Sequence, residues 1–200
     1  MLRRCCGRLS LDDQPYNKTL ANLRLAALFV TVAALLWISH PTPLSVYVGF
    51  GLVALGESIR FWAAGHLFKT QELITSGPYR FTRNPLYLGR LLIFTGVAVM
   101  AWLPYGVNLV VLVLGWAGFF GYYLPRKERV EPDRLRRTHG EPYDRYFKAV
   151  PALFPTPIPY PAPSAGGWSS DRMLRNREQW MVLGLLLISA FMLWRAHTLS

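Results

Sequence analysis

The stretch GPYRFTRNPLYLGR, residues 77–90, lies between two apolar blocks of the chain and carries more polar chemistry than a simple turn requires. Gly77-Pro78 and Asn84-Pro85 are turn signals, because the residue before a proline is disfavoured in the helical conformation. Pro85 suits the first position of a helix. We therefore expect a turn that ends in a helix start, whose free amides could meet an anion. The same residues also fit a plain capped helix entry with arginines that reach the membrane surface.

The apolar residues of this 200-residue chain make up 52% of it and are gathered in long blocks. Blocks of about 20 apolar residues are typical of membrane-spanning helices. We predict an all-α polytopic integral membrane protein, with about five transmembrane helices at residues 20–39, 46–64, 86–102, 107–124 and 180–195. The first block is too long for a signal peptide and lacks a small-residue cleavage site. The last block is short for a bilayer and could instead lie at its surface.

The proline-rich stretch PALFPTPIPYPAP, residues 151–163, separates the last apolar block from the others. Proline-rich segments are typically extended and serve as linkers. We predict a membrane domain at residues 1–155, a proline-rich linker at 156–179 and the fifth transmembrane helix at 180–195.

Lysine and arginine, which give the chain a net charge of +11, are concentrated in alternate connectors. The N-terminal segment and the connectors at residues 65–85 and 125–150 carry them, whereas the two short connectors between apolar blocks carry none. Because cytosolic loops are enriched in these residues, we predict that the N-terminus and both polar connectors are cytosolic. The positive charge therefore indicates membrane topology, and an apolar chain of this kind is not a soluble nucleic-acid-binding module.

The chain has two cysteines, Cys5 and Cys6, which are adjacent. Their spacing fits neither a disulfide framework nor a zinc site, so we expect no metal centre. Free thiols in a reducing compartment are the expectation, with S-acylation near the membrane left open.

The connector at residues 125–150 has apolar residues at steps of three and four, which predicts an amphipathic helix, or a helix pair broken near Gly140 and Pro142. Such a basic helix could simply lie on anionic lipid. Glu131 is an acid among many cations, and it could begin a helix, because Pro132 follows, or bind an ammonium group. In the second apolar block, Glu57 and Arg60 share one helix face, as ion-paired residues inside a membrane span do.

Two segments of these connectors read QELITSGPYRFTRNPLYLG and, later in the chain, EPDRLRRTHGEPYDRYFKAVP. They resemble the isoprenylcysteine carboxyl methyltransferase family, whose wider group includes phospholipid N-methyltransferases. The family pattern is G-x-Y, R-[HN]-P-x-Y-x-G, then a Glu-Glu pair, F-G, Y-x-x-Y and V-P, and the match covers residues 60–155. The resemblance implies that S-adenosylmethionine binds in a pocket closed by both connectors.

Carried over by position, the resemblance assigns the following cofactor contacts: His66, Gln71, Glu72, Leu73, Ile74, Tyr79, Asn84, Pro85, Leu86, Tyr87 and Glu131. Glu131 would hold the ammonium of the cofactor. The substrate-side arginine of the family falls at Lys127, with Arg126 beside it, and these two residues with Tyr87 are the catalytic candidates. Asn84 stands in place of the commoner histidine, Pro132 replaces the second acid of the pair, and His139 replaces the phenylalanine before Gly140.

The resemblance implies an S-adenosylmethionine-dependent membrane methyltransferase that methylates the carboxylate of an isoprenylcysteine-like lipophilic substrate taken from the bilayer. A water-poor pocket favours this reaction, because a cation and an anion lose their charges in it. A phospholipid amine or a small thiol stays open as the acceptor, and an amine would need a base such as Tyr87 or Glu57. A membrane reductase that holds NADPH at Arg134, Arg136 and Arg137 is the alternative of another class, and a non-catalytic membrane anchor is a third. The sequence gives no indication of the oligomeric state.

Overall fold

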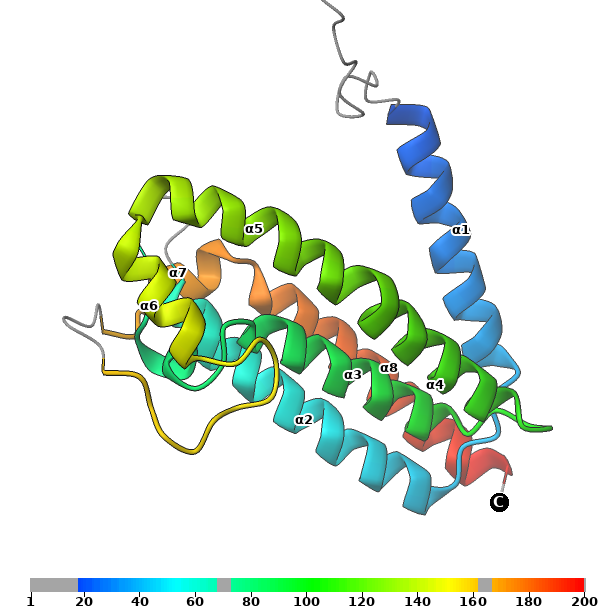
Figure 1. The fold of residues 1–200 in the computed structure, drawn as a ribbon. Coiled ribbons are helices and arrows are strands. Elements are labelled where there is room, and N and C mark those ends of the chain that lie inside the picture. Colours follow the sequence, from blue (N-terminus) through cyan, green and yellow to red (C-terminus); the bar gives the residue numbers. More distant parts are fainter. Residues whose placement is uncertain (1–17, 68–72, 162–166, 200) are drawn as a thin grey trace, which may run out of the picture. The chain divides into compact units, whose positions relative to one another are not determined.

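A computed structural model describes residues 18–67, 73–161 and 167–199, and in these ranges the chain is helical with connecting loops and no strand. The predicted all-α class is therefore confirmed. The elements in chain order are α1 (Lys18–Trp37), α2 (Pro43–His66), the 3₁₀ turn η1 (Gly77–Arg80), α3 (Pro85–Ala101), α4 (Val107–Gly118), the π-helical segment η2 (Phe119–Tyr123), α5 (Leu124–His139), α6 (Glu141–Ala149), α7 (Ser170–Arg175) and α8 (Glu178–Leu199). Met1–Trp37 is a unit of its own, and Ile38–Ser200 forms the other unit (Figure 1).

Three helices among the described residues are long and apolar enough to cross a membrane. They are α2, the continuous helix Val107–His139 that contains α4, η2 and α5, and α8. Helix α3 is apolar but has only 17 residues. The predicted count of about five transmembrane helices is thus not confirmed. The last helix has 22 residues, which is longer than the block predicted at 180–195 and sufficient for a bilayer.

Helix α2 begins at the short uncharged connector between the first two apolar blocks. The Ser45 amide donates to the Thr42 hydroxyl at 3.1 Å, and the Thr42 amide donates to Ser45 Oγ at 3.0 Å. This reciprocal capping box satisfies amides that have no partner inside the helix, and Pro43 supplies the first helical position.

Helices α2 and α3 pack closely along two glycine pairs. A Cβ added to Gly56 would lie 2.7 Å from the Gly89 carbonyl oxygen, and one added to Gly96 would lie 2.6 Å from the Gly49 carbonyl oxygen. From one contacting pair to the other, the residue number rises on α3 and falls on α2, so the two helices are antiparallel. Small residues allow this approach, which lipid-embedded helices use in place of a hydrophobic driving force.

Helix α8 is joined to α2 by a buried ion pair. Arg60 Nη2 lies 2.9 Å and 2.7 Å from the two carboxylate oxygens of Glu178, while Arg60 Nε lies 3.5 Å from Glu57. Pairing of Glu57 with Arg60 was predicted from the sequence, but the closer partner is Glu178. At the other end of α8, Arg195 Nε donates to the Ser39 carbonyl at 2.8 Å.

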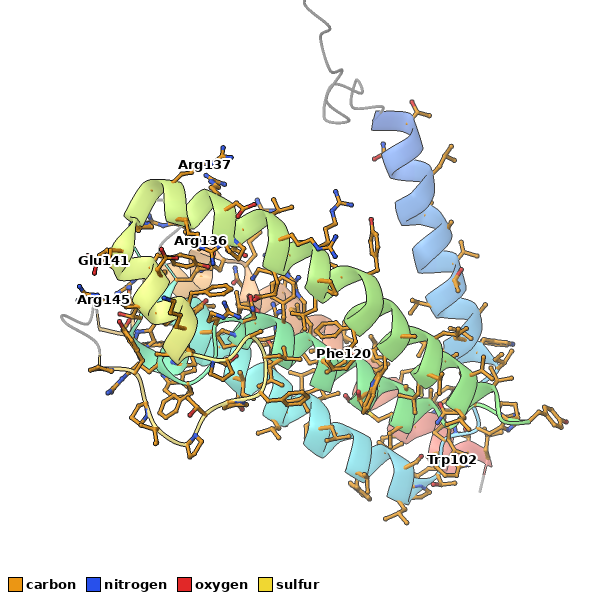
Figure 2. The ribbon with its side chains drawn as sticks, in the orientation of Figure 1. Trp102, Phe120, Arg136, Arg137, Glu141 and Arg145 are labelled. Carbon is orange, nitrogen blue, oxygen red and sulfur yellow. The ribbon has the colours of Figure 1, made fainter. Side chains whose placement is uncertain are left out.

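The second polar connector forms two helices, as its periodicity predicts. Helix α5 ends at His139, Gly140 adopts a φ of +58°, and α6 begins at Glu141. The interpretation of Glu131 as a helix start is wrong, because Pro132 lies inside α5, which continues from α4 without a break. Figure 2 shows four charged side chains gathered where α5 meets α6, namely Arg136, Arg137, Glu141 and Arg145. They lie at the opposite end of the unit Ile38–Ser200 from Trp102.

The described part of the proline-rich stretch contains no helix and packs against the first polar connector. The amides of Arg83, Thr156 and Tyr160 donate to the carbonyls of Pro151, Phe81 and Arg80, each at 2.9 Å. The residues after α6 are thereby fixed beside the loop that leads into α3. The domain boundaries predicted here stay a prediction.

Candidate functional site

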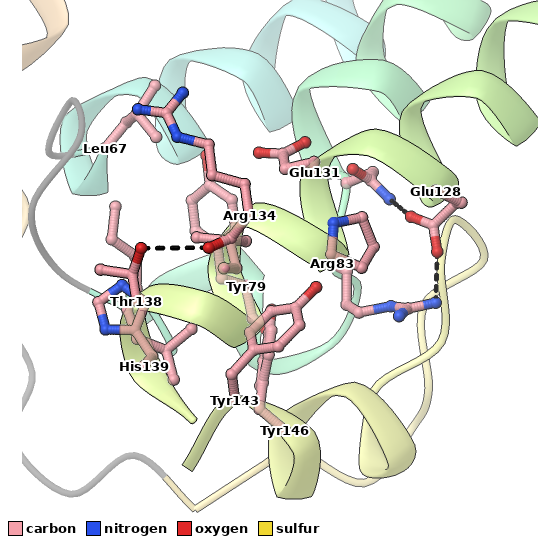
Figure 3. Close-up of a pocket in the computed structure, with 15 residues that line it drawn as sticks. Leu67, Tyr79, Arg83, Glu128, Glu131, Arg134, Thr138, His139, Tyr143 and Tyr146 are labelled. Atoms are coloured by element: carbon pink, nitrogen blue, oxygen red, sulfur yellow. Dashed lines mark hydrogen bonds and ion pairs between the residues drawn. The ribbon is translucent and has the colours of Figure 1, made fainter. Parts of the chain in front are cut away.

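The two polar connectors meet around a cavity of ≈ 390 Å³. The loop before α3 forms one wall, and α5 with α6 forms the other (Figure 3). The lining residues are Leu67, Leu73, Ile74, Tyr79, Arg83, Asn84, Glu128, Glu131, Pro132, Arg134, Leu135, Thr138, His139, Tyr143 and Tyr146. The meeting of these two connectors, which the resemblance implies, is present in the structure.

The end of α2 supports the loop wall of the cavity. His66 is buried, and its Nδ1 lies 3.1 Å from the Ser76 hydroxyl, with which it shares a hydrogen bond. Gly77 has a φ of +57°, and a Cβ there would lie 2.4 Å from the His66 ring. Glycine at this position therefore permits both the backbone conformation and the close approach of the imidazole. His66 lies behind the loop and is absent from the cavity lining.

Asn84 connects the start of α3 with α5 and with the chain after α6. Its Nδ2 donates to Glu128 Oε1 at 2.7 Å and to the Ala152 carbonyl at 2.8 Å, and its Oδ1 accepts from Lys127 Nζ. Asn84 is buried, so these contacts fix the orientation of its amide. The carbonyl of Asn84 also accepts from the Tyr87 and Leu88 amides, so the start of α3 has few amides free for an anion.

Arg83 lies on one side of the cavity with its guanidinium held in place. Arg83 Nη2 lies 2.7 Å from Glu128 Oε2, and Arg83 Cζ lies 3.6 Å from the centroid of the Phe147 ring. Its Nε and Nη1 are buried and have no hydrogen-bond partner among the described residues. Figure 3 shows the Glu128 carboxylate joined to Arg83 by a dashed line, with Glu131 also at the cavity.

Lys127 and Glu131 form an ion pair one helical turn apart on α5. Lys127 Nζ lies 3.0 Å from Glu131 Oε2 and 3.8 Å from the centroid of the Tyr87 ring. The Glu131 side chain is 49% exposed, so its carboxylate can also meet a ligand. Arg126 turns away from this network, because its Nη1 donates to the Tyr122 hydroxyl at 2.7 Å. The structure thus brings Lys127 to two cavity-lining residues and leaves Arg126 outside.

Three tyrosines form much of the remaining wall. The Tyr146 hydroxyl donates to the Tyr79 carbonyl at 2.8 Å, whereas the Tyr79 hydroxyl is buried without a partner in the described part of the chain. Burial raises the pKa of Tyr143 to about 12 and raises the pKa values of Tyr79 and Tyr146 as well. These hydroxyls therefore stay protonated near neutral pH, and they act as hydrogen-bond donors and not as bases.

The predicted cofactor contacts fall into three groups. Leu73, Ile74, Tyr79, Asn84 and Glu131 line the cavity. Four others lie outside the cavity lining, namely His66, Pro85, Leu86 and Tyr87. Pro85 is fully buried, and the Leu86 carbonyl accepts from Arg60 Nη1. Gln71 and Glu72 lie outside the described residues. Glu57, a candidate base for an amine acceptor, lies on a different face, in a groove between α2 and α8.

Several cavity residues were not predicted from the sequence. They are Leu67, Arg83, Glu128, Pro132, Leu135, Thr138, His139, Tyr143 and Tyr146. Arg134, which also lines the cavity, was named from the sequence only as an NADPH contact of the alternative reductase. Leu135, His139, Tyr143 and Tyr146 belong to the three- and four-residue periodicity, which could have pointed to them. Glu128 lies three residues before Glu131, a spacing that places both acids on one helix face.

No group of three or more histidine, cysteine, aspartate or glutamate residues within the described ranges could hold a metal ion.

Comparison with known proteins identifies related sequences. Residues 44–124 match a family model for phospholipid methyltransferases. Over 121 residues, the chain is 35% identical to a probable protein-S-isoprenylcysteine O-methyltransferase of Oryza sativa subsp. japonica, an alignment that covers 54% of this chain and 60% of the rice protein. It is 33% identical to a cobalt-zinc-cadmium resistance protein of Cupriavidus metallidurans, over 60% of this chain and 51% of that protein. It is 30% identical to a nickel-cobalt-cadmium resistance protein of Alcaligenes xylosoxydans xylosoxydans, over 60% of this chain and 52% of that protein.

The resemblance stated from the sequence is confirmed by the family match and the rice relative. The chain is thus a membrane protein similar to the isoprenylcysteine and phospholipid methyltransferases. It spans about half to three fifths of the length of the curated relatives it matches. No solved structure matches it.

Proposed function

We propose that this protein is an S-adenosylmethionine-dependent membrane methyltransferase that methylates the carboxylate of a lipophilic, isoprenylcysteine-like acceptor. The observation that carries the proposal is the cavity in which Glu131, Asn84 and Tyr79 come together from the two motif-bearing connectors. The proposal is also supported by the similarity to phospholipid methyltransferases over residues 44–124, a range that includes the loop before α3 that forms one wall of this cavity.

The cavity residues fit the cofactor chemically. S-adenosylmethionine supplies a methyl group on a sulfonium, together with an amino-acid end and an adenosine. The exposed carboxylate of Glu131 suits an ammonium group. The buried Tyr79 hydroxyl has no partner among the described residues and can donate to a polar atom of a nucleoside. Leu73, Leu135 and the tyrosines provide apolar and aromatic surface for a base.

In this reaction the protein mainly positions the cofactor and the acceptor, and it needs little acid–base catalysis. A carboxylate acceptor carries no proton that must be removed, which agrees with tyrosines that stay protonated near neutral pH. Lys127 is the cation beside the cavity that can hold this carboxylate, because it lies between Asn84 and Glu131. Correct placement of two reacting groups contributes a large part of the rate in reactions of this kind.

The cavity lies where charged helices meet apolar ones, so a water-soluble cofactor and a lipophilic acceptor can both reach it. We place this end of the protein on the cytosolic side, together with the N-terminus, because the connectors that form it carry the positive charge. Membrane lipids are the expected surroundings of α2, α3 and α8.

The test is methyl transfer from radiolabelled S-adenosylmethionine by the protein in lipid nanodiscs. The acceptors are an S-farnesylcysteine with a free carboxylate, its methyl ester, phosphatidylethanolamine and a small lipophilic thiol. We expect label on the free carboxylate alone, in a base-labile form. Label on the phospholipid or the thiol would leave a methyltransferase with a different acceptor, whereas no label on any acceptor would contradict the proposal.

A further inference from the structure

Arg83 has two guanidinium N–H donors, Nε and Nη1, that form no hydrogen bond with any described residue. Its side chain is only 12% exposed, and one end of the guanidinium is fixed by Glu128 at 2.7 Å while the Phe147 ring covers one face at 3.6 Å. The remaining donors, Nε and Nη1, are buried without a hydrogen-bond partner among the described residues. Buried donors without partners are costly, so this arrangement suits a site whose acceptor comes from a ligand.

The chemistry of the unused donors selects the ligand group. Nε and Nη1 lie on opposite sides of the guanidinium and do not form one fork, but each is a charged donor, and charged donors bind anionic oxygens such as those of a carboxylate most strongly. The amides at the start of α3, which were the carboxylate site expected from the sequence, are not suited to this role. Those of Tyr87 and Leu88 already donate to the Asn84 carbonyl at 3.0 and 3.1 Å.

A side chain of the opposite charge lines the same cavity. Glu131 lines it with a half-exposed carboxylate, and Arg83 lines it with a buried cation (Figure 3). Besides Glu128, which is engaged by Arg83 and Asn84, and Arg134, the cavity thus offers the Glu131 carboxylate and the Arg83 guanidinium, which are complementary to a group that carries both an ammonium and a carboxylate. The amino-acid end of S-adenosylmethionine is such a group.

Glu128 explains why the guanidinium is held in one orientation. Its two carboxylate oxygens accept from Arg83 Nη2 and from Asn84 Nδ2, both at 2.7 Å. Position 132, one turn later on α5, also faces the cavity but carries a proline in place of an acid. Glu128 is therefore the acid that anchors the loop residues to this part of α5.

We propose that Arg83 binds the carboxylate of the amino-acid end of the cofactor, and that Glu128 is the positioning residue that holds Arg83 in place. This inference rests on the proposed function. It adds a ligand-binding residue and a positioning residue that neither the sequence pattern nor the similarity assigns.

The experiment compares two ligands by calorimetry with detergent-purified full-length protein. S-adenosylmethionine carries the amino-acid end, and 5′-methylthioadenosine lacks it. We expect Arg83→Gln and Glu128→Gln each to weaken binding of S-adenosylmethionine by about tenfold to a hundredfold, while binding of 5′-methylthioadenosine changes by less than about threefold. The double variant should be no weaker than Arg83→Gln, because Glu128 acts through Arg83.

Glu141→Gln is the matched control, since Glu141 pairs with Arg145 on α6 and both side chains are exposed. It should leave both affinities unchanged. Arg83→Lys keeps the charge but removes the Nε and Nη1 donors, and it replaces Arg83→Gln if the latter does not fold. We expect it to lose affinity for S-adenosylmethionine selectively as well.

An equal loss of affinity for both ligands in the variants would overturn the inference, because Glu128 and Arg83 would then maintain only the shape of the cavity. Unchanged affinity for S-adenosylmethionine in folded variants would overturn it too. In both outcomes the wild-type protein still binds S-adenosylmethionine, so the proposed function stands. Failure of the wild-type protein to bind S-adenosylmethionine would overturn the proposed function and this inference together.

Discussion

Arg60 Nη2 lies 2.9 and 2.7 Å from the two carboxylate oxygens of Glu178, so the C-terminal third of α2 is joined to the first residue of α8. Both side chains are almost completely buried, with 4% and 6% of their surface exposed. This ion pair stabilises the fold only while both partners are present, because removal of either one takes the compensating charge from a buried ion.

The first prediction concerns this pair. Glu178→Ala should lower the free energy of unfolding by up to about 3–5 kcal/mol, because it removes the closer carboxylate and leaves the buried Arg60 guanidinium with Glu57, 3.5 Å from its Nε. The measurement is unfolding in detergent micelles, followed by circular dichroism. Replacing both partners, as in Arg60→Met with Glu178→Leu, should restore most of the loss. Glu141→Ala, which breaks an exposed pair, should change stability by less than about 1 kcal/mol. A loss in the Glu178 variant no greater than in this control would show that the pair contributes little.

The second prediction concerns the contact between α2 and α3. Gly89→Ala should destabilise the protein by about 1–3 kcal/mol, because a Cβ there would lie 2.6 Å from the Gly56 carbonyl oxygen. Gly51→Ala on α2 is the matched control, since nothing lies within 4 Å of its added Cβ. Alanine at that position should be neutral or stabilising by up to about 1 kcal/mol, because it favours the helix. Unfolding in detergent measures both variants, and similar effects at the two positions would argue against close packing of the helices.

The third prediction concerns pH. Tyr143 has an ordinary pKa of 10.0, and burial raises it to about 12 in the folded protein. The folded state therefore favours the neutral phenol. Its contribution to stability is complete below about pH 10 and is lost as the pH rises towards about 12. The free energy of unfolding, measured from pH 8 to pH 12, should be level at first and then fall, and Tyr143→Phe should reduce the fall. An identical profile for the variant would remove Tyr143 as a cause.

The fourth prediction separates the two candidate substrate-side cations. Lys127→Gln should lower the rate of methyl transfer by more than about tenfold, because Lys127 Nζ bridges Asn84 and Glu131 at the cavity. Arg126→Gln should change the rate by less than about threefold, because Arg126 contacts the exposed Tyr122. Initial rates at saturating cofactor, over a range of acceptor concentrations, measure both. A larger effect at Arg126 would place the acceptor on the other side of α5.

The helices could be predicted from the sequence, because they depend on local signals. The meeting of the two connectors was predicted from the charge pattern, which places both on one side of the membrane, and from the family resemblance. Long apolar blocks, turn signals at Gly77-Pro78 and Asn84-Pro85, and the break at Gly140 each act over a few residues. The same local reasoning failed at Pro132. A proline commonly marks a helix start, yet here it lies within a helix that is already established by the residues before it.

The ion pairs Arg60–Glu178 and Arg83–Glu128 could not be predicted, because they join residues far apart in the chain. Glu178 lies in a segment outside the family resemblance, and nothing in its neighbourhood points to Arg60. Glu128 was one of several charged residues in a strongly basic connector. Only the packing of α5 against the loop shows that its carboxylate meets Arg83 and Asn84. The helix-start residues Pro85 and Leu86 illustrate the opposite case, since their place in the motif is clear but the structure turns them away from the cavity.

Calorimetric titration of detergent-purified protein with S-adenosylmethionine and, separately, with NADPH tests whether the cavity is a methyl-donor site. We expect the wild-type protein to bind S-adenosylmethionine and not NADPH. Glu131→Ala should weaken this binding by about tenfold or more while the protein stays folded, because the cofactor ammonium loses its carboxylate. Glu141→Ala should bind as the wild type does. Binding of NADPH alone, or full affinity for S-adenosylmethionine in folded Glu131→Ala, would contradict the assignment of the cavity.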